Sequence, residues 1–331
     1  MSEIAISAVL VVVGLAALFY GANWLVVGSS TVARRLGISE MVIGLTIVAY
    51  GTSTPELAVS IAAALEGHAD IVLGNVVGSN ISNIGLIVGL SAVMLPIAIS
   101  RTTIRREVPI MIGIALLLVA LSIDGSISRI DGVLLLGGLV VFTYFIYARV
   151  KKERSSTHLP TSEAELKEDR RRYRRSFLLV GIGIGLLFAG SFITVDNAVI
   201  VAKSLGISER VIGLTIIAIG TSLPELVTSL VALRKGHAKI SIGNIVGSNI
   251  YNILIIIGLS STLVGITVNP AIYTDYLIMI IFSLAFLAMM RTKFVISRLE
   301  GYLLASAYIA YLVMLFISGN ALPILDLILF T

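Results

Sequence analysis

Residues 40–65 read EMVIGLTIVAYGTSTPELAVSIAAAL, an apolar run long enough to cross a bilayer as a helix. A glycine, three hydroxyl residues, a proline and a carboxylate interrupt this run at GTSTPEL, residues 51–57. Proline has no N–H and its ring clashes with the carbonyl four residues earlier, so we expect the helix to break here. The carbonyls that this break frees are tolerable in a bilayer only where protein, water or an ion satisfies them.

The composition is that of a membrane protein. Of the 331 residues, 57% are hydrophobic and only 13% are charged, and the mean hydropathy is +1.03. A soluble domain carries about a quarter charged residues. The absence of cysteine excludes disulfides and thiol chemistry. Glu3 stands where a signal peptide would carry Lys or Arg, so we expect the apolar N-terminus to be a retained first span.

The interrupted run occurs twice. Residues 37–90 align without a gap on residues 206–259, 169 positions later, and 35 of the 54 positions are identical. The second copy carries GTSLPEL at residues 220–226. The chain is therefore a duplication of one unit. A duplicated unit with Gly/Pro-interrupted spans at matching positions is typical of secondary transporters that bind their substrate at the midplane.

Ten spans are expected, five in each half, and an odd number per half means that the copies are inverted in the membrane. The expected spans are 5–31, 40–65, 71–96, 107–123, 131–148, 177–201, 210–233, 240–266, 274–290 and 301–318. Of the 24 Lys and Arg residues, 21 fall in one set of alternating loops, and the other set holds only Arg129, Lys203 and Arg210. The positive-inside rule therefore predicts that both termini lie outside a plasma membrane.

The predicted organisation is a first half at 1–148, a basic cytoplasmic linker at 149–176 and a second half at 177–331. The linker contains RRRYRR at residues 170–175. In a soluble protein this run could indicate nucleic-acid binding, but beside a span it is typical of topology and of contact with anionic lipid. We therefore expect a bilayer and no nucleic acid as partner. The linker is too short for a regulatory domain, and a monomer would suffice for function.

Two carboxylates lie at the depth of the interruptions. Glu56 and Glu225 each lie about 16 residues into a span, and neither has an obvious basic partner at similar depth. An unpaired Glu at mid-bilayer costs roughly 3 kcal/mol on insertion scales, so protons or bound cations must neutralise the pair. Because the copies are inverted, we expect the two glutamates to approach each other near the axis.

Each half also contains a second polar motif, GNVVGSNISN at residues 74–83 and GNIVGSNIYN at residues 243–252. Its serine and its last asparagine lie four residues apart, on one helical face. The glycine pair within it is a small-xxx-small pattern that favours close helix packing. Packing alone would not need the asparagines, whose amides supply further oxygen ligands.

Together these groups make an all-oxygen cage with a charge of minus two. Calcium accepts 6–8 oxygen ligands in flexible geometry. No His or Cys belongs to the predicted cage, which argues against zinc or copper. His68 and His237 lie at span ends and are interpreted as structural.

The paired motifs GTSTPEL with GNVVGSNISN, and GTSLPEL with GNIVGSNIYN, resemble the two repeats of the cation/calcium antiporter superfamily, most closely the microbial sodium/calcium exchangers. The resemblance covers essentially the whole transmembrane chain. It implies an all-α membrane protein with ten helices, broken helices at the midplane and four clustered cation sites. It implies an antiporter of Na⁺ and Ca²⁺, with no enzymatic activity and no cofactor beyond the transported ions. It also implies that the first helix of each half slides against the core.

The resemblance implies a role for each repeated polar residue. Glu56 and Glu225 would be shared by calcium and sodium. The middle position would be completed by Asn83 and Asn252. Calcium would also bind the backbone carbonyls of Thr52 and Thr221. One outer sodium site would use Ala49, Ser53 and Ser79. The mirror sodium site would use Ala218, Ser222 and Ser248.

The sequence departs from its relatives at two places. The potassium-dependent branch usually has Asp where this chain has Asn252, so potassium co-transport is not expected. Thr54 replaces a common aliphatic residue, with no consequence that the sequence reveals. Proton-coupled antiport is the alternative, although that branch has a different motif.

Two other classes could also use buried carboxylates. An intramembrane aspartyl protease needs paired Asp motifs (YD and GxGD) that this chain lacks. A cation channel would favour rings of carboxylates in an oligomer.

Overall fold

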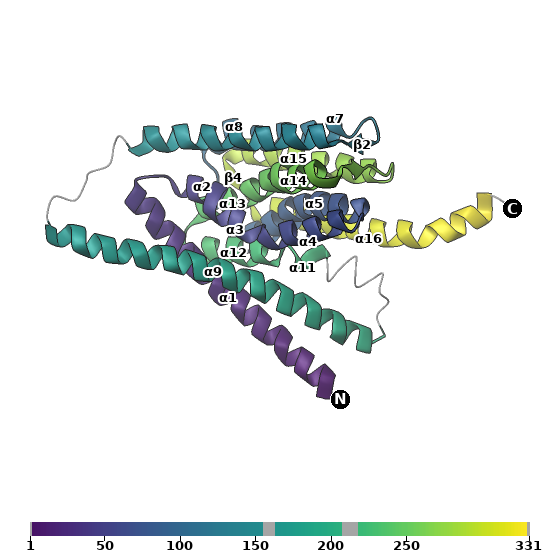
Figure 1. Cartoon of the computed structure of the whole chain (residues 1–331), viewed down its shortest axis with the longest axis horizontal. Helices are drawn as coiled ribbons and strands as arrows, with labels where there is room; N and C mark the ends of the chain where they lie inside the picture. Colours follow the sequence, from purple (N-terminus) through teal and green to yellow (C-terminus); the bar gives the residue numbers. More distant parts are fainter. Residues whose placement is uncertain (1, 155–162, 207–217, 330–331) are drawn as a thin grey trace.

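A computed structural model describes residues 2–154, 163–206 and 218–329, which are almost entirely helical (Figure 1). The first half contains α1 (Ser2–Leu36), α2 (Glu40–Ile43), η1 (Gly44–Val48), α3 (Ala49–Thr52), α4 (Thr54–Leu65), α5 (Ala69–Ser82), η2 (Asn83–Val88), α6 (Gly89–Met94), β1 (Ile97–Ala98), η3 (Thr103–Glu107), α7 (Val108–Leu121), β2 (Ser126–Ile127) and α8 (Arg129–Arg154), where η denotes a π-helical segment. The second half contains α9 (Glu163–Ser204), α11 (Ala218–Gly220), α12 (Leu223–Arg234), α13 (Ala238–Tyr251), η5 (Asn252–Ile257), α14 (Gly258–Val264), β3 (Ile266–Thr267), α15 (Ile272–Lys293), β4 (Val295–Ile296) and α16 (Arg298–Leu329).

The element bounds repeat with the same offset as the sequence. Strand β3 lies 169 residues after β1, and β4 lies 169 residues after β2, so the members of each pair are equivalent in the repeat. Strand β1 pairs antiparallel with β4, and β2 pairs antiparallel with β3, so each two-stranded sheet joins the halves. The equivalent strands β2 and β4 lie at opposite ends of the helix bundle (Figure 1). This arrangement confirms the predicted inversion.

The helices are long and apolar enough for a membrane. Seven pass the length and hydropathy test within the described residues, or eight if the bent pair Glu40–Thr52 and Thr54–Leu65 is one span. Large apolar side chains on the outer helices face outward, with Val12 65% and Val140 69% exposed, as a lipid-facing surface requires. The predicted seventh span, 210–233, lies partly outside the described residues.

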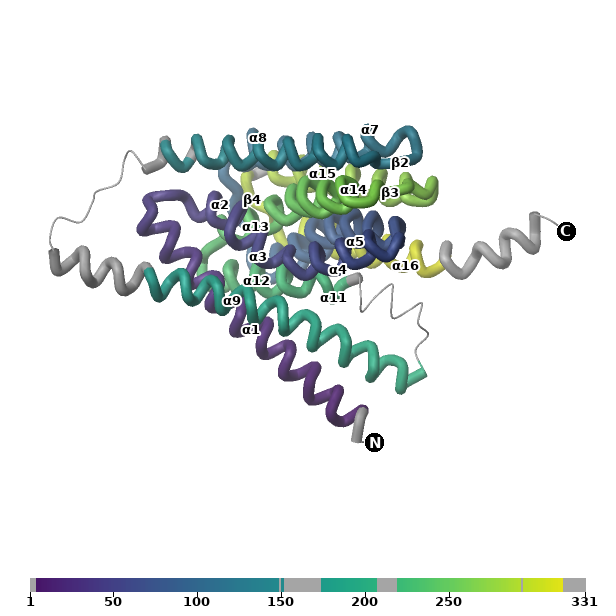
Figure 2. Tube along the Cα trace, viewed as in Figure 1, coloured from purple at the N-terminus to yellow at the C-terminus, as the bar shows by residue number. Residues whose placement is uncertain are grey.

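The helices on both sides of the predicted linker extend beyond their predicted ends. Helix α8 continues to Arg154 and α9 begins at Glu163, so much of the 149–176 linker is helical. Lys, Arg and Glu are strong helix formers, and they continue the helix past the apolar part of the span. Figure 2 shows α8 along one side of the helix bundle and α9 along the other.

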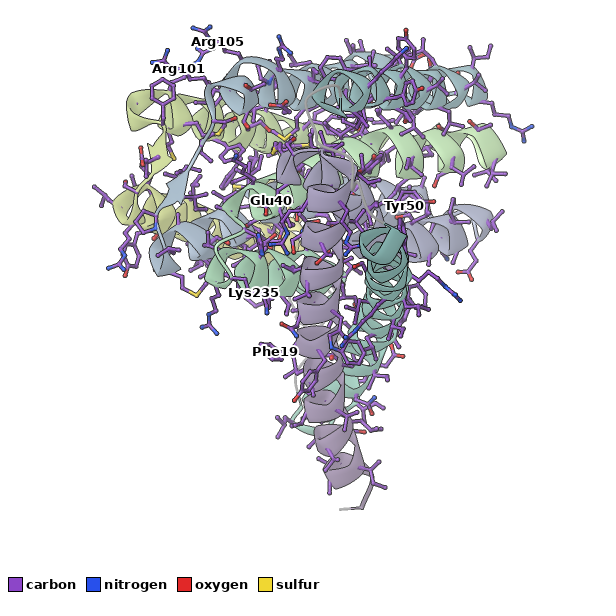
Figure 3. All side chains as sticks on the ribbon, turned by 90° about the vertical axis from the view of Figure 1, so that its left-hand side faces the viewer. Phe19, Glu40, Tyr50, Arg101, Arg105 and Lys235 are labelled. Carbon is purple, nitrogen blue, oxygen red and sulfur yellow. The ribbon has the colours of Figure 1, made fainter. Side chains whose placement is uncertain are left out.

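Helices α1 and α9 pack along each other at one flank of the bundle (Figures 1 and 3). Their contact depends on equivalent glycines. A methyl group added at Gly21 would lie 2.9 Å from the carbonyl oxygen of Gly183, and one added at Gly190 would lie 2.9 Å from that of Gly14. The rest of the bundle encloses α13, in which Ile240 to Tyr251 are all buried.

Candidate cation-binding site

The predicted helix breaks are present in both halves. Ser53 separates α3 from α4 and has φ −80° and ψ 8°. Thr221 and Ser222 separate α11 from α12, and Ser222 has φ −89° and ψ 5°. The first break bends its span by 46°. A proline follows two residues later in each copy, where it is compatible with the first turn of a helix. The breaks therefore place Glu56 and Glu225 in the first turns of α4 and α12, where the helix dipole favours negative charge.

The two carboxylates converge, as the inverted repeat predicts. Glu56 is 1% exposed and Glu225 is fully buried, and the two side chains are close enough to interact. The Ser53 hydroxyl donates to Glu225 Oε1 at 2.9 Å, and the Ser222 hydroxyl lies 3.5 Å from Glu56 Oε1. Each serine hydroxyl thus lies against the carboxylate of the other half. Within the described part of the chain, neither carboxylate forms an ion pair with Lys, Arg or His.

Two asparagines that sequence reasoning did not single out hold the breaks in place. The Thr52 hydroxyl donates to Asn244 Oδ1 at 3.0 Å, and the Thr221 hydroxyl donates to Asn75 Oδ1 at 3.3 Å. The Asn75 amide in turn donates to the Glu56 carbonyl at 3.2 Å.

Equivalent contacts tie Asn244 to the Glu225 carbonyl at 3.4 Å and to the Ser229 hydroxyl at 3.1 Å. Each asparagine therefore connects the glutamate carbonyl of its own half to the threonine of the other half.

The contacts of the remaining predicted ligands differ between the two halves. Ser79 accepts a hydrogen bond from Ser222 at 3.2 Å. The Asn252 amide donates to Asn80 Oδ1 at 3.1 Å. Ala49 is buried and its carbonyl accepts the backbone N–H of Ser53. The side chain of Ala218 lies outside the described residues.

Several oxygens of this cluster are buried without a hydrogen-bond partner among the described residues. They are Glu56 Oε2, Glu225 Oε2, Asn83 Oδ1, Ser248 Oγ and Asn252 Oδ1. Buried polar atoms in native proteins are nearly always paired. These five oxygens, two of which belong to the carboxylates, are ligands of the kind that a hard cation accepts, and the cation would neutralise the charge.

One end of the molecule is sealed above this cluster. A methyl group added at Gly243 would lie 2.8 Å from the Met41 carbonyl oxygen and 2.9 Å from Gly44 Cα. His237 Nδ1 lies 2.7 Å from Glu40 Oε1, so this histidine joins the two halves. Figure 3 views this end, where Lys235, Arg101 and Arg105 also lie.

The other end is hollow. A cavity of about 430 Å³ is lined by Gly74, Gly78 and three polar residues of the cluster, Asn75, Ser79 and Thr221. A second cavity of about 480 Å³ is lined by Pro55 and again by Thr221. Gly74 and Gly78 are the counterparts of the tightly packed Gly243 and Gly247 in the other half. The same motif is therefore closed at one end of the molecule and open at the other.

An inverted repeat, two broken helices and a buried oxygen cluster with two carboxylates define a secondary cation transporter. The sodium/calcium exchanger protein family matches residues 6–148 and 175–317, once in each half, and the chain belongs to this family.

Individual relatives agree. The chain is 33% identical to the sodium/calcium exchanger MaX1 of Methanosarcina acetivorans, over 95% of this chain and 99% of that protein. It is 39% identical to the inner membrane protein YrbG of Escherichia coli, over 93% of this chain and 96% of that protein. A structure of the sodium-calcium exchanger NCX_Mj superposes with a TM-score of 0.81 at 32% identity, covering 93% of this chain and 98% of that one. These relatives are transport or membrane proteins, and none is named as an enzyme.

Proposed function

We propose that this protein exchanges Na⁺ for Ca²⁺ across a cell membrane by alternating access. The observation that carries the proposal is the reciprocal pair of Glu56 and Glu225. Each has a carboxylate oxygen within 3.5 Å of a serine hydroxyl of the other half, and neither is paired with a basic residue of the described chain. Two buried carboxylates need about two positive charges, which one Ca²⁺ or a pair of Na⁺ ions supplies.

In the proposed arrangement, calcium lies between the two glutamates and takes the backbone carbonyls of Thr52 and Thr221. Asn83 and Asn252 complete the middle position. One outer sodium site uses Ala49, Ser53 and Ser79, and its mirror uses Ala218, Ser222 and Ser248. The unpaired oxygens of Glu56, Glu225 and the two asparagines support this assignment.

The charge of the cluster explains how the two fluxes are coupled. An empty cluster has two unneutralised carboxylates. Surrounding these charges with the apolar surface of the sliding helices costs free energy. A filled cluster is close to neutral. Helices α1 and α9 therefore slide against the bundle only when sodium or calcium is bound to the cluster. The glycine contacts between α1 and α9 support movement of these helices as one pair.

We also propose the topology. The basic loops at the sealed end lie in the cytoplasm, and both termini lie outside, so the two cavities open outward. The distribution of Lys and Arg supports this orientation. The resemblance to an inner membrane protein supports the plasma membrane as its location. A monomer contains the whole cluster, so no partner copy is required.

The proposal is tested by calcium binding to the purified chain. Glu56→Gln and Glu225→Gln keep the shape of the side chain and remove one charge each. Both should lose calcium binding by at least about a hundredfold, since breaking buried charge interactions costs about 3 kcal/mol or more. Glu66→Gln is the matched control, because Glu66 lies exposed at the end of the helix that contains Glu56. Unchanged calcium affinity in either buried variant would refute the assignment.

A further inference from the structure

The cavity of about 430 Å³ contains a carboxylate that lies outside the repeated motifs. Asp275, in the first turn of α15, lines the cavity of about 430 Å³ together with Asn75, Ser79 and Thr221 of the cluster. Among the described residues that line this cavity, Asp275 is the only charged one. A single continuous space thus joins a third carboxylate to the cation cluster.

Asp275 is held in place by the opposite wall of the cavity. The Tyr311 hydroxyl of α16 donates to Asp275 Oδ1 at 2.9 Å. Asp275 is half-buried, and it forms no ion pair within the described part of the chain. Its second carboxylate oxygen is not used in this bond, so the side chain can still attract a cation while Tyr311 fixes its position.

The inverted repeat shows that this charge is specific to one end. The residue equivalent to Asp275, 169 positions earlier, is Arg106. The equivalence holds at this site because β1 and η3 begin 169 residues before β3 and α15. Arg106 is exposed at the opposite end of the molecule. The two ends therefore differ by two charges at equivalent positions, although the motifs that form the cation cluster are nearly identical in sequence.

We propose that Asp275 is a peripheral cation-attracting residue, which concentrates Ca²⁺ and Na⁺ in the cavity before they reach Glu56 and Glu225. The proposal rests on the proposed function and adds a functional difference between the two faces of the protein. A charge of one sign in a low-dielectric cleft raises the local concentration of counter-ions and their rate of association. Asp275 therefore lowers the calcium concentration needed for half-maximal transport at the cavity face, and has no such effect at the opposite face.

The test uses exchange of unlabelled calcium for radioactive calcium, which does not depend on whether Na⁺ or H⁺ is the coupling ion. It compares right-side-out and everted membrane vesicles from cells that express the full chain. For Asp275→Asn we expect the half-saturating calcium concentration to rise about tenfold at the cavity face at low ionic strength, the lower end of what charge focusing achieves. At the opposite face it should not change. The maximal rate should be retained, because the cluster itself is intact.

Two further variants separate charge from structure. Tyr311→Phe removes the hydrogen bond but keeps the charge, and Asp275→Glu keeps the charge, so both should stay within a factor of about three of the unmodified chain. Raising the ionic strength to about 1 M with choline chloride shortens the screening length to about 3 Å, and should remove most of the difference between Asp275→Asn and the unmodified chain.

An equal effect of Asp275→Asn at both faces, no effect at either face, or an effect that Tyr311→Phe reproduces would overturn the proposal. An unmodified chain that exchanges no calcium in either vesicle type would instead overturn the proposed function, and this inference with it.

Discussion

A methyl group at Gly243 should shift the protein between its two access states. The added Cβ would lie 2.8 Å from the Met41 carbonyl oxygen and 2.9 Å from Gly44 Cα, where carbon contacts prefer about 3.5 to 4.0 Å. Both neighbours are backbone atoms and cannot rotate away. Such overpacking costs about 1 to 3 kcal/mol, which corresponds to a shift of roughly five- to a hundredfold in an equilibrium.

The cost applies to the state in which α13 is sealed against η1 and α2. Gly243→Ala should therefore favour the opposite state, in which this end opens and the cavity end closes. Gly74→Ala is the matched control, because Gly74 is the equivalent residue and lines the open cavity. It should leave the present state unchanged and penalise the opposite one. Both substitutions change helix propensity by the same amount, so that contribution cancels.

Labelling of a single cysteine measures the shift, since the natural chain contains none. Val59→Cys places a thiol between the two cavities, both of which Val59 lines. A membrane-impermeant thiol reagent on the cavity side should label it several-fold more slowly with Gly243→Ala, and equally fast or faster with Gly74→Ala. If the two alanine variants change the labelling rate equally or in the opposite order, the reasoning about sealed and open ends is refuted.

Two more predictions follow from the site. Asn75→Ala and Asn244→Ala each remove the asparagine acceptor of a threonine hydroxyl and the donor to a glutamate carbonyl. Because an unsatisfied buried group costs about 1 to 3 kcal/mol, each variant should reduce calcium affinity by about ten- to a hundredfold. A calcium titration that gives an affinity within a factor of two of the unmodified chain would contradict this. Cation ligands must be deprotonated, so lowering the pH should raise the half-saturating calcium concentration while saturating calcium restores the maximal rate. Flux assays from about pH 8 to pH 5 check this, and a loss of maximal rate that calcium cannot restore would point to acid damage rather than competition.

The sequence predicts the central features because they depend on residues that are costly anywhere else. A proline and a glutamate within an apolar span mark the helix break and the site, and the duplication with five spans per half predicts that Glu56 and Glu225 meet. The predicted break at GTSxPE, the inversion and the approach of the two carboxylates are all confirmed. The assignment of individual ions to individual ligands stays a prediction.

Other features depend on contacts between the halves, which no local pattern encodes. Asn75 and Asn244 lie within the quoted GNVVGSN and GNIVGSN motifs. Their hydrogen bonds to the threonine of the opposite half form only when the two halves pack together. The sealed and open ends cannot be read from motifs that are nearly identical. Asp275 lies in an unremarkable first turn of a helix, and only the cavity connects it to the site. The helical extensions at residues 149–154 and 163–176 were not predicted, because their charged residues were interpreted as part of a connection.

The central claim is tested most directly by radioactive calcium uptake into proteoliposomes that contain the purified chain and are loaded with sodium. The external solution contains sodium, potassium or choline, with and without an imposed pH gradient. Sodium/calcium exchange predicts uptake only when sodium can flow outward, with no response to the pH gradient, and loss of uptake in Glu56→Gln. Uptake that follows the pH gradient and ignores sodium would contradict the claim and assign proton-coupled antiport to the same fold and site.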